Sequence, residues 1–124
     1  MPKVLVIDDE PLVALMVQRT LQETHEVSVE HSARASVDRF ARGERFDVVI
    51  SDLNLPDGDA AWVRQELARL DPTLPRRLLV ITGGAGTASG RALLREPGVR
   101  WLRKPFRSAE LIAEVDSVLA AVTA

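Results

Sequence analysis

Hydrophobic residues along this chain follow two different spacings. Short runs rich in valine, isoleucine and leucine recur at intervals, and in several of them the apolar residues occupy consecutive positions. Consecutive apolar positions are typical of strands that are buried on both faces, as in a parallel sheet. The runs predict five strands, at about residues 3–7, 26–31, 47–51, 77–82 and 99–102.

The segments between these runs carry apolar residues three or four positions apart. Such stripes are typical of helices that pack on a sheet. The stripes of the first, third and last predicted helices are Val13, Met16, Val17 and Leu21; Val63, Leu67 and Leu70; and Leu111, Ile112, Val115, Val118, Leu119 and Val122. Three glycines, Gly84, Gly86 and Gly90, lower the helix propensity of residues 84–96, so we expect a short or mobile fourth helix there.

Turn residues separate the predicted elements, for example at Pro56-Asp57-Gly58 and at Gly83-Gly84. Five strand–helix units in 124 residues, without repeats or a low-complexity linker, predict an α/β domain with a doubly wound sheet. A chain of this length buries one core and leaves no room for a second. We therefore expect residues 1–124 to form one domain.

The composition narrows the class of protein further. Sixteen basic residues stand against 18 acidic ones, and this net charge of −2 offers no electrostatic basis for binding nucleic acid or an anionic membrane. The chain has no cysteine, which fits a reducing cytoplasm and excludes disulfides and thiolate metal sites. No apolar run approaches the roughly 18 residues of a membrane span, and no signal-peptide pattern is present. These features predict a soluble, cytoplasmic domain without direct contact to nucleic acid or membrane.

Polar side chains directly follow four of the five predicted strands. Asp8 and Asp9 follow the first strand, Asp52 the third, Thr82 the fourth and Lys104 the fifth. In doubly wound sheets the ligand site forms outside the carboxyl ends of the strands. We therefore expect these five side chains to converge on one site.

This set of residues predicts a metal and a phosphoryl group as ligands. Three crowded carboxylates, Asp8, Asp9 and Asp52, resist ionisation unless a cation lies between them, and Mg²⁺ prefers a few carboxylates together with water and phosphate. Only Lys3 and Lys104 among the 16 basic residues are lysines. A compact ammonium suits a single phosphoryl oxygen better than a planar guanidinium does. A surface lysine without function remains the alternative for Lys104 alone.

Four motifs of the chain carry a resemblance to a known family. "VLVIDDEP", "DVVISDLNLPDGD", "LLVITG" and "WLRKPF" occur in this order, span essentially all 124 residues and are highly specific together. The chain resembles the receiver domain of two-component response regulators, a flavodoxin-like phosphoacceptor module. The resemblance implies a doubly wound five-stranded parallel sheet with helices on both faces, a (βα)5 chain and the strand order 2-1-3-4-5.

The resemblance also implies a role for each residue of the predicted site. Asp52 would be the phosphoacceptor, and Asp8 and Asp9 the acidic pair that binds metal. Thr82 would be the switch hydroxyl and Lys104 the partner of a phosphoryl oxygen. From the chemistry of Mg²⁺ we expect Asp9 and Asp52 to bind the ion directly and Asp8 to act through a metal-bound water.

Three further expectations come from the resemblance. The family's metal site also takes the backbone carbonyl two residues past the phosphoacceptor, which here belongs to Asn54. The peptide bond between Lys104 and Pro105 is the candidate for a cis bond. Trp101 stands where the family usually has a tyrosine or phenylalanine whose ring rotates inward, so it is either a second switch residue or a packing residue.

The expected function is that of a phosphoacceptor in two-component signal transduction. A carboxylate such as Asp52 can attack a phosphoryl group in line when metal, ammonium and hydroxyl groups meet the developing charge. The domain would catalyse its own phosphorylation and dephosphorylation, without being an enzyme that acts on a separate substrate. Its expected partners are a histidine kinase or phosphotransfer domain, and a downstream protein or output domain on the face made by the fourth helix, fifth strand and fifth helix.

The sequence is compatible with several settings of the domain. The "TGG" and "KPF" motifs are similar to those of receivers at the ends of hybrid sensor kinases. A stand-alone regulator, part of a larger regulator and a homodimer are the other arrangements that the sequence allows.

Two alternatives from other classes of protein fit the sequence less well. A haloacid-dehalogenase-type phosphatase places its nucleophile after the first strand in Asp-x-Asp, whereas here Asn54 stands two positions after Asp52. A receiver-like interaction module that takes no phosphate would have lost a key residue, and the acidic pair, Asp52 and Lys104 are all present.

His25 and His31 are expected to be surface residues and not phosphate carriers.

Overall fold

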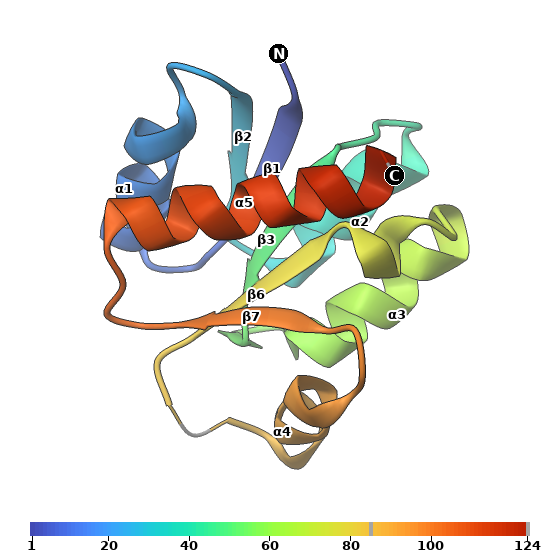
Figure 1. Ribbon diagram of the computed structural model, residues 1–124. Coiled ribbons are helices and arrows are strands. Elements are labelled where there is room, and N and C mark those ends of the chain that lie inside the picture. The colour runs from blue at the N-terminus through green and yellow to red at the C-terminus, as the bar shows by residue number, and fades with distance from the viewer. Residues whose placement is uncertain (85, 124) are drawn as a thin grey trace.

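A five-stranded parallel sheet forms the centre of the computed structural model (Figure 1), which describes residues 1–84 and 86–123. Its strands lie in the order β2-β1-β3-β6-β7. Counted along the chain as the five parallel strands, this is the expected order 2-1-3-4-5. The strands are β1 (Lys3–Ile7), β2 (Glu26–Glu30), β3 (Val48–Asp52), β6 (Leu78–Thr82) and β7 (Arg100–Arg103).

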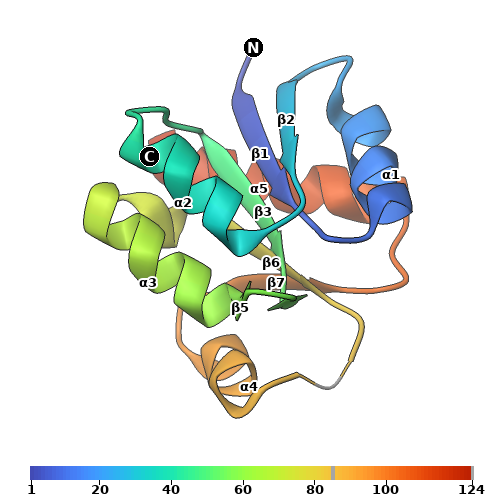
Figure 2. The same ribbon diagram turned by 180° about the vertical axis from the view of Figure 1, so that it is seen from behind.

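Helices cover both faces of the sheet, as the views from the two sides show (Figures 1 and 2). One core cluster packs α1 and α5 on one face, and the other packs α2, α3 and α4 on the opposite face. The helices are α1 (Pro11–Leu21), α2 (Ala33–Ala41), α3 (Ala60–Leu70), α4 (Ala88–Arg95) and α5 (Ser108–Thr123), with a short 3-10 helix η1 (Leu74–Arg76). None of the helices within the described residues is long and apolar enough to cross a membrane.

The central strands explain the consecutive apolar positions of the sequence. In β1, Val4 and Val6 contribute to the cluster with α1 and α5, whereas Leu5 and Ile7 contribute to the cluster with α2 and α3. β3 and β6 are buried along their whole length in the same way. The edge strands β2 and β7 are only partly buried, because each has one neighbouring strand.

Three predicted core positions on the helices are wrong. Met16, Leu70 and Ile112 are 43%, 38% and 40% exposed. These side chains remain partly in solvent because only one side of a helix contacts the sheet. On α5, for example, Leu111 is fully buried while the adjacent Ile112 points to solvent.

The surface position expected for His25 is also wrong, since this residue is only 7% exposed. It follows α1, where its Nδ1 lies 2.8 Å from the Thr24 hydroxyl and 3.2 Å from the carbonyl oxygen of Leu21. These partners satisfy the polar ring in a buried position. His31 is exposed, as expected.

A small antiparallel hairpin follows β3 and was not predicted. It consists of β4 (Asn54–Leu55) and β5 (Gly58–Asp59), joined through the turn that the sequence indicated. The Asp57 carboxylate in this turn accepts hydrogen bonds from the backbone N–H groups of Ala33 and Arg34, at 2.8 and 2.9 Å. The hairpin is therefore fixed to the start of α2.

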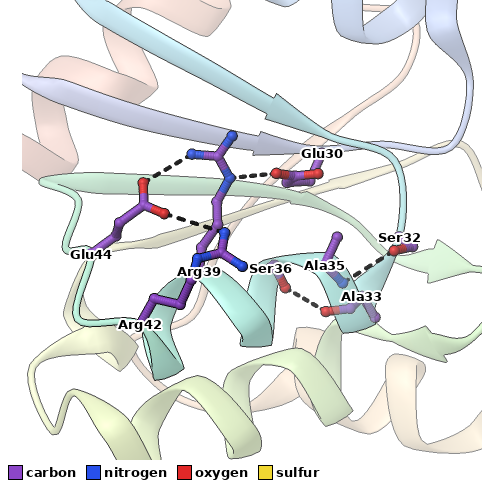
Figure 3. A network of polar contacts seen from close by, with 8 residues as sticks. All are labelled: Glu30, Ser32, Ala33, Ala35, Ser36, Arg39, Arg42 and Glu44. Carbon is purple, nitrogen blue, oxygen red and sulfur yellow. Dashed lines mark hydrogen bonds and ion pairs between the residues drawn. The ribbon is translucent and has the colours of Figure 1, made fainter.

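A polar network ties α2 to the edge strand β2 (Figure 3). Ser32 begins the helix, and its hydroxyl accepts a hydrogen bond from the Ala35 N–H at 3.1 Å. Near the end of the helix, the Arg39 guanidinium donates to Glu30 of β2 and, at 3.0 Å, to Glu44. These charged groups flank the open edge of the sheet.

The fourth helix is short, as predicted from its glycines: α4 has eight residues. The expected segment 84–96 includes residue 85, which lies outside the described residues.

Candidate functional site

The predicted site residues gather at the carboxyl ends of four adjacent strands. Asp8 directly follows β1, Asp52 ends β3 and Thr82 ends β6, and these three side chains are buried. Lys104 directly follows β7 and is half-buried. A parallel sheet places all these strand ends at one edge, which is why residues so distant in sequence meet.

The Lys104 ammonium lies among three carboxylates. Its Nζ is 3.7 Å from Asp8 Oδ2, 3.7 Å from Asp52 Oδ1 and 3.8 Å from Glu10 Oε1. These distances are too long for direct hydrogen bonds. The ammonium is therefore attracted to all three carboxylates and does not form a hydrogen bond with any one of them. An ammonium in this position is free to approach an added anionic group.

Glu10 belongs to the acidic cluster, although the sequence analysis pointed to Asp9. One carboxylate oxygen each from Asp8, Glu10 and Asp52 lie within 4.8 Å of one another. Asp9 is exposed and lies outside this trio. It still lines the pocket above Asp52, which has a volume of about 350 Å³ and is formed by Asp9, Glu10, Asp52, Asn54, Gly83, Gly84 and Lys104.

The signal for Glu10 was present in the sequence as the third acid of the run that follows β1. Glu10 precedes Pro11 and occupies the N-cap position of α1, where its side chain makes no capping hydrogen bond. Its backbone N–H donates to Asp8 Oδ1 at 2.9 Å, which fixes the turn that directs Glu10 toward the pocket.

The electrostatics of the pocket favour a cation. The pKa of Asp52 is raised to about 6, chiefly by burial and in smaller part by the charges of Asp8 and Asp9, while Lys104 opposes the rise. Burial likewise raises the pKa of Asp8, opposed by its hydrogen bond from the Glu10 N–H and by Lys104. One ammonium therefore does not balance the carboxylates. A divalent cation with oxygen ligands fits this donor set.

The Thr82 hydroxyl is bonded to its own loop. It donates to the Gly84 carbonyl oxygen at 3.1 Å and lies 3.2 Å from the Gly84 N–H, which donates to it. The Thr82 carbonyl accepts a hydrogen bond from the Lys104 N–H at 2.7 Å, so β6 and β7 stay paired up to the site. Thr82 therefore has to release Gly84 before its hydroxyl proton can reach another acceptor.

Two further expectations from the sequence concern the last strand and the residues that follow it. The Lys104–Pro105 peptide bond is cis. Trp101 on β7 is 42% exposed, so its ring is not enclosed in the core.

His31, which directly follows β2, contacts the backbone of the site, a contribution that was not predicted from the sequence. Its Nδ1 donates to the backbone carbonyl of Asp8 at 2.9 Å. No pattern in the sequence signalled this contact, because it depends on the parallel pairing of β1 with β2.

Comparisons with known proteins agree on one family. The family model described as "Response regulator receiver domain" matches residues 4–116. A probable transcriptional regulatory protein, TcrX of Mycobacterium tuberculosis, is 32% identical over 117 residues, covering 94% of this chain and 49% of the relative. The transcriptional regulatory protein CutR of Streptomyces coelicolor is 35% identical over 115 residues, covering 91% and 51%. The chain thus spans about half the length of these relatives.

Solved structures show the same fold. A response regulator receiver protein from Sinorhizobium medicae superposes with a TM-score of 0.82 at 29% identity, covering 97% of this chain and 95% of that one. A receiver domain protein from Clostridium thermocellum gives a TM-score of 0.85 at 24% identity, with 99% and 98% covered. Because the family model matches most of the sequence and relatives above 30% identity cover nearly all of it, the chain belongs to the response regulator receiver domains of two-component systems.

Proposed function

We propose that residues 1–124 form a receiver domain in which Asp52 accepts a phosphoryl group from the phosphohistidine of a histidine kinase or a phosphotransfer domain. The observation that carries the proposal is the setting of the Asp52 carboxylate. It lies at the end of β3, lines the pocket and is only 3.7 Å from the Lys104 ammonium. A carboxylate with a pKa of about 6 is mostly ionised at neutral pH and therefore able to act as a nucleophile.

In the proposed reaction, an Asp52 oxygen attacks the phosphorus in line. A new O–P bond forms while the N–P bond of the phosphohistidine breaks, and the histidine leaves as its imidazole. Lys104 binds one phosphoryl oxygen, and Thr82 binds another after releasing Gly84. The product is an acyl phosphate on Asp52, which the same domain hydrolyses, so it turns over no separate substrate.

The residues proposed to hold Mg²⁺ are Asp9 and Asp52 through direct contact, Asp8 through a metal-bound water and Asn54 through its backbone carbonyl. Asp9, Asp52 and Asn54 all line the pocket. The bound ion would supply positive charge that lets the carboxylates and the phosphoryl oxygens share one site. Glu10 adds a further negative charge beside them.

The proposed output face is formed by α4, β7 and α5. Lys104 directly follows β7, and residues 83–87 connect Thr82 with α4, so both site residues border this face. Trp101 is proposed as a second moving residue on it. Its partner is a downstream protein, an output domain or a second copy of the chain.

The proposal also concerns where the domain works. We propose a cytoplasmic location, without direct binding to nucleic acid or membrane. A place at the end of a hybrid kinase is one setting that fits the proposal.

Acetyl phosphate provides a direct test of the phosphoacceptor. With Mg²⁺, intact-mass measurement should show one added phosphoryl group on the wild-type protein and none on Asp52→Asn. Asp38→Asn is the matched control, because Asp38 is an exposed aspartate on α2 and should leave labelling unchanged. Full labelling of Asp52→Asn would refute the assignment of the nucleophile.

The same measurement separates the alternative function. A receiver-like interaction module would remain folded and unlabelled at any Mg²⁺ concentration. The phosphoacceptor is supported over this alternative by Asp52, Lys104 and Thr82, which all lie at the site.

A further inference from the structure

One carboxylate joins the start of α3 to the start of α4. Asp59 Oδ1 accepts the hydrogen bond from the Trp62 N–H that caps α3, at 2.9 Å. Its other oxygen, Oδ2, accepts hydrogen bonds from the hydroxyls of Thr87, at 2.5 Å, and of Ser89. We call this group of Asp59, Thr87 and Ser89 the Asp59 latch. Figure 2 shows α4 beside the start of α3.

The start of α4 also packs closely on the residues that directly follow the phosphoacceptor Asp52. A Cβ atom on Gly86 would lie 2.9 Å from Leu53 Cδ2 and 3.0 Å from Asn54 Oδ1, and one on Gly90 would lie 3.1 Å from Leu53 Cδ1. Leu53 is fully buried and directly follows Asp52. Glycine at these positions allows an approach that any side chain would obstruct.

The latch is connected to the proposed phosphorylation site from two directions. Asp59 pairs with Asn54 in the β4–β5 hairpin that follows Asp52. Thr87 is only five residues beyond Thr82, whose hydroxyl is held by Gly84. A movement of Thr82 toward Asp52 would therefore displace the segment that ends at Thr87, and the hydrogen bond from Thr87 to Asp59 would oppose that displacement.

We propose that the Asp59 latch is a brake that positions α4 in the resting state and sets the free-energy cost of switching. Hydrogen bonds to a carboxylate are stronger than those between neutral groups, and here they exist only while α4 stays against α3. A phosphoryl group shifts the two states only by the difference in contacts that it makes in each. Weakening the resting state should therefore make the switch easier. This inference rests on the proposed function.

Ser89→Ala tests the brake with little risk to folding. Ser89 is exposed, and alanine favours a helix, so the variant removes only the hydroxyl, with its hydrogen bond to Asp59 and its 3.2 Å contact with the Thr87 hydroxyl. Beryllofluoride with Mg²⁺, a mimic of the phosphoryl group, should bind this variant roughly two- to fivefold more tightly than the wild type. Thr87→Ser keeps the hydroxyl and should bind as the wild type does. Ser32→Ala, which removes the N-cap hydroxyl at the start of another helix, α2, is the control and should leave the affinity unchanged.

Hydrogen exchange without any ligand provides the second readout. The amides of residues 90–95 in α4 should exchange roughly two- to fivefold faster in Ser89→Ala, and at the wild-type rate in Ser32→Ala. Unchanged exchange in Ser89→Ala would overturn the latch. Faster exchange with unchanged beryllofluoride affinity would overturn its role as a brake. If the wild type itself fails to bind beryllofluoride, the proposed function fails, and the exchange rates still decide whether the latch holds α4.

Discussion

At the scale of single residues, the Asp52 carboxylate destabilises the metal-free protein at neutral pH. Its pKa in the folded state is about 6, above the ordinary value of 3.8, chiefly because the group is buried. The folded state therefore binds a proton more tightly than the unfolded state does. The contribution of this one group to stability is greatest below its unfolded pKa and is lost as the pH rises through about 6. A group that is useful for chemistry is thus unfavourable for folding.

This linkage predicts that Asp52→Asn stabilises the protein when divalent cations are chelated. At pH 7 the free energy of unfolding should rise by about 1 to 3 kcal/mol, and the gain should shrink toward pH 4. Urea denaturation in EDTA at several pH values measures both effects. Asp38→Asn should show neither of them, and a loss of stability in Asp52→Asn at pH 7 would contradict the assigned pKa shift.

Residue identity and position predicted most of the site. Asp8, Asp52, Thr82 and Lys104 follow strands, so the sheet alone brings them together. Glu10 was missed because its direction depends on the turn between β1 and α1, where the Asp8 side chain binds the Glu10 N–H. A turn of this kind leaves no periodic signal in the sequence.

At the scale of secondary-structure elements, the contact between α2 and β2 depends on one arginine. Arg39 is 22% exposed and bridges Glu30 and Glu44, and its hydrogen bond with Glu30 raises its pKa. Arg42, three residues further along, is 64% exposed and, among the described residues, forms an ion pair with Glu44 alone, at 3.6 Å. The two arginines in Figure 3 thus differ in burial and in the number of partners.

Arg39→Ala should lower the free energy of unfolding by about 1 to 2 kcal/mol, because it removes two charge-assisted hydrogen bonds and the packing of the side-chain stem. Arg42→Ala should change it by less than about 0.5 kcal/mol, as is typical of an exposed ion pair. Urea denaturation at pH 7 compares the two variants. Equal effects would show that the network contributes nothing beyond ordinary surface charge.

The elements were predictable to different degrees for physical reasons. The buried strands β1, β3 and β6 could be predicted from their consecutive apolar residues. The hairpin of β4 and β5 has two residues in each strand, too few for any period to appear. The exposure of Ile112 depends on how α5 is rotated about its axis on the sheet. Tertiary packing determines this rotation, and a stripe of apolar residues in the sequence does not specify it.

At the scale of the whole molecule, basic and acidic residues are distributed unevenly along the chain. Residues 83–107 contain six basic residues and one acidic residue, although the whole chain has a net charge of −2. This segment includes α4 and β7 and ends just beyond Lys104. A phosphoryl group on Asp52 would add negative charge of about −1.5 to −2 at its border. The added charge therefore favours movement of this segment toward the site.

The whole-molecule prediction is that beryllofluoride with Mg²⁺ protects residues 83–106 from hydrogen exchange more than any other part of the chain. Thr82 and Lys104 bracket this segment, and both are expected to move toward the phosphoryl mimic on Asp52. The effect should disappear in Asp52→Asn, since the mimic then has no carboxylate to bind. If the largest change instead falls on α1 and α2, the switch acts through a different surface of the domain. Thr82 and Trp101 are then not its moving residues.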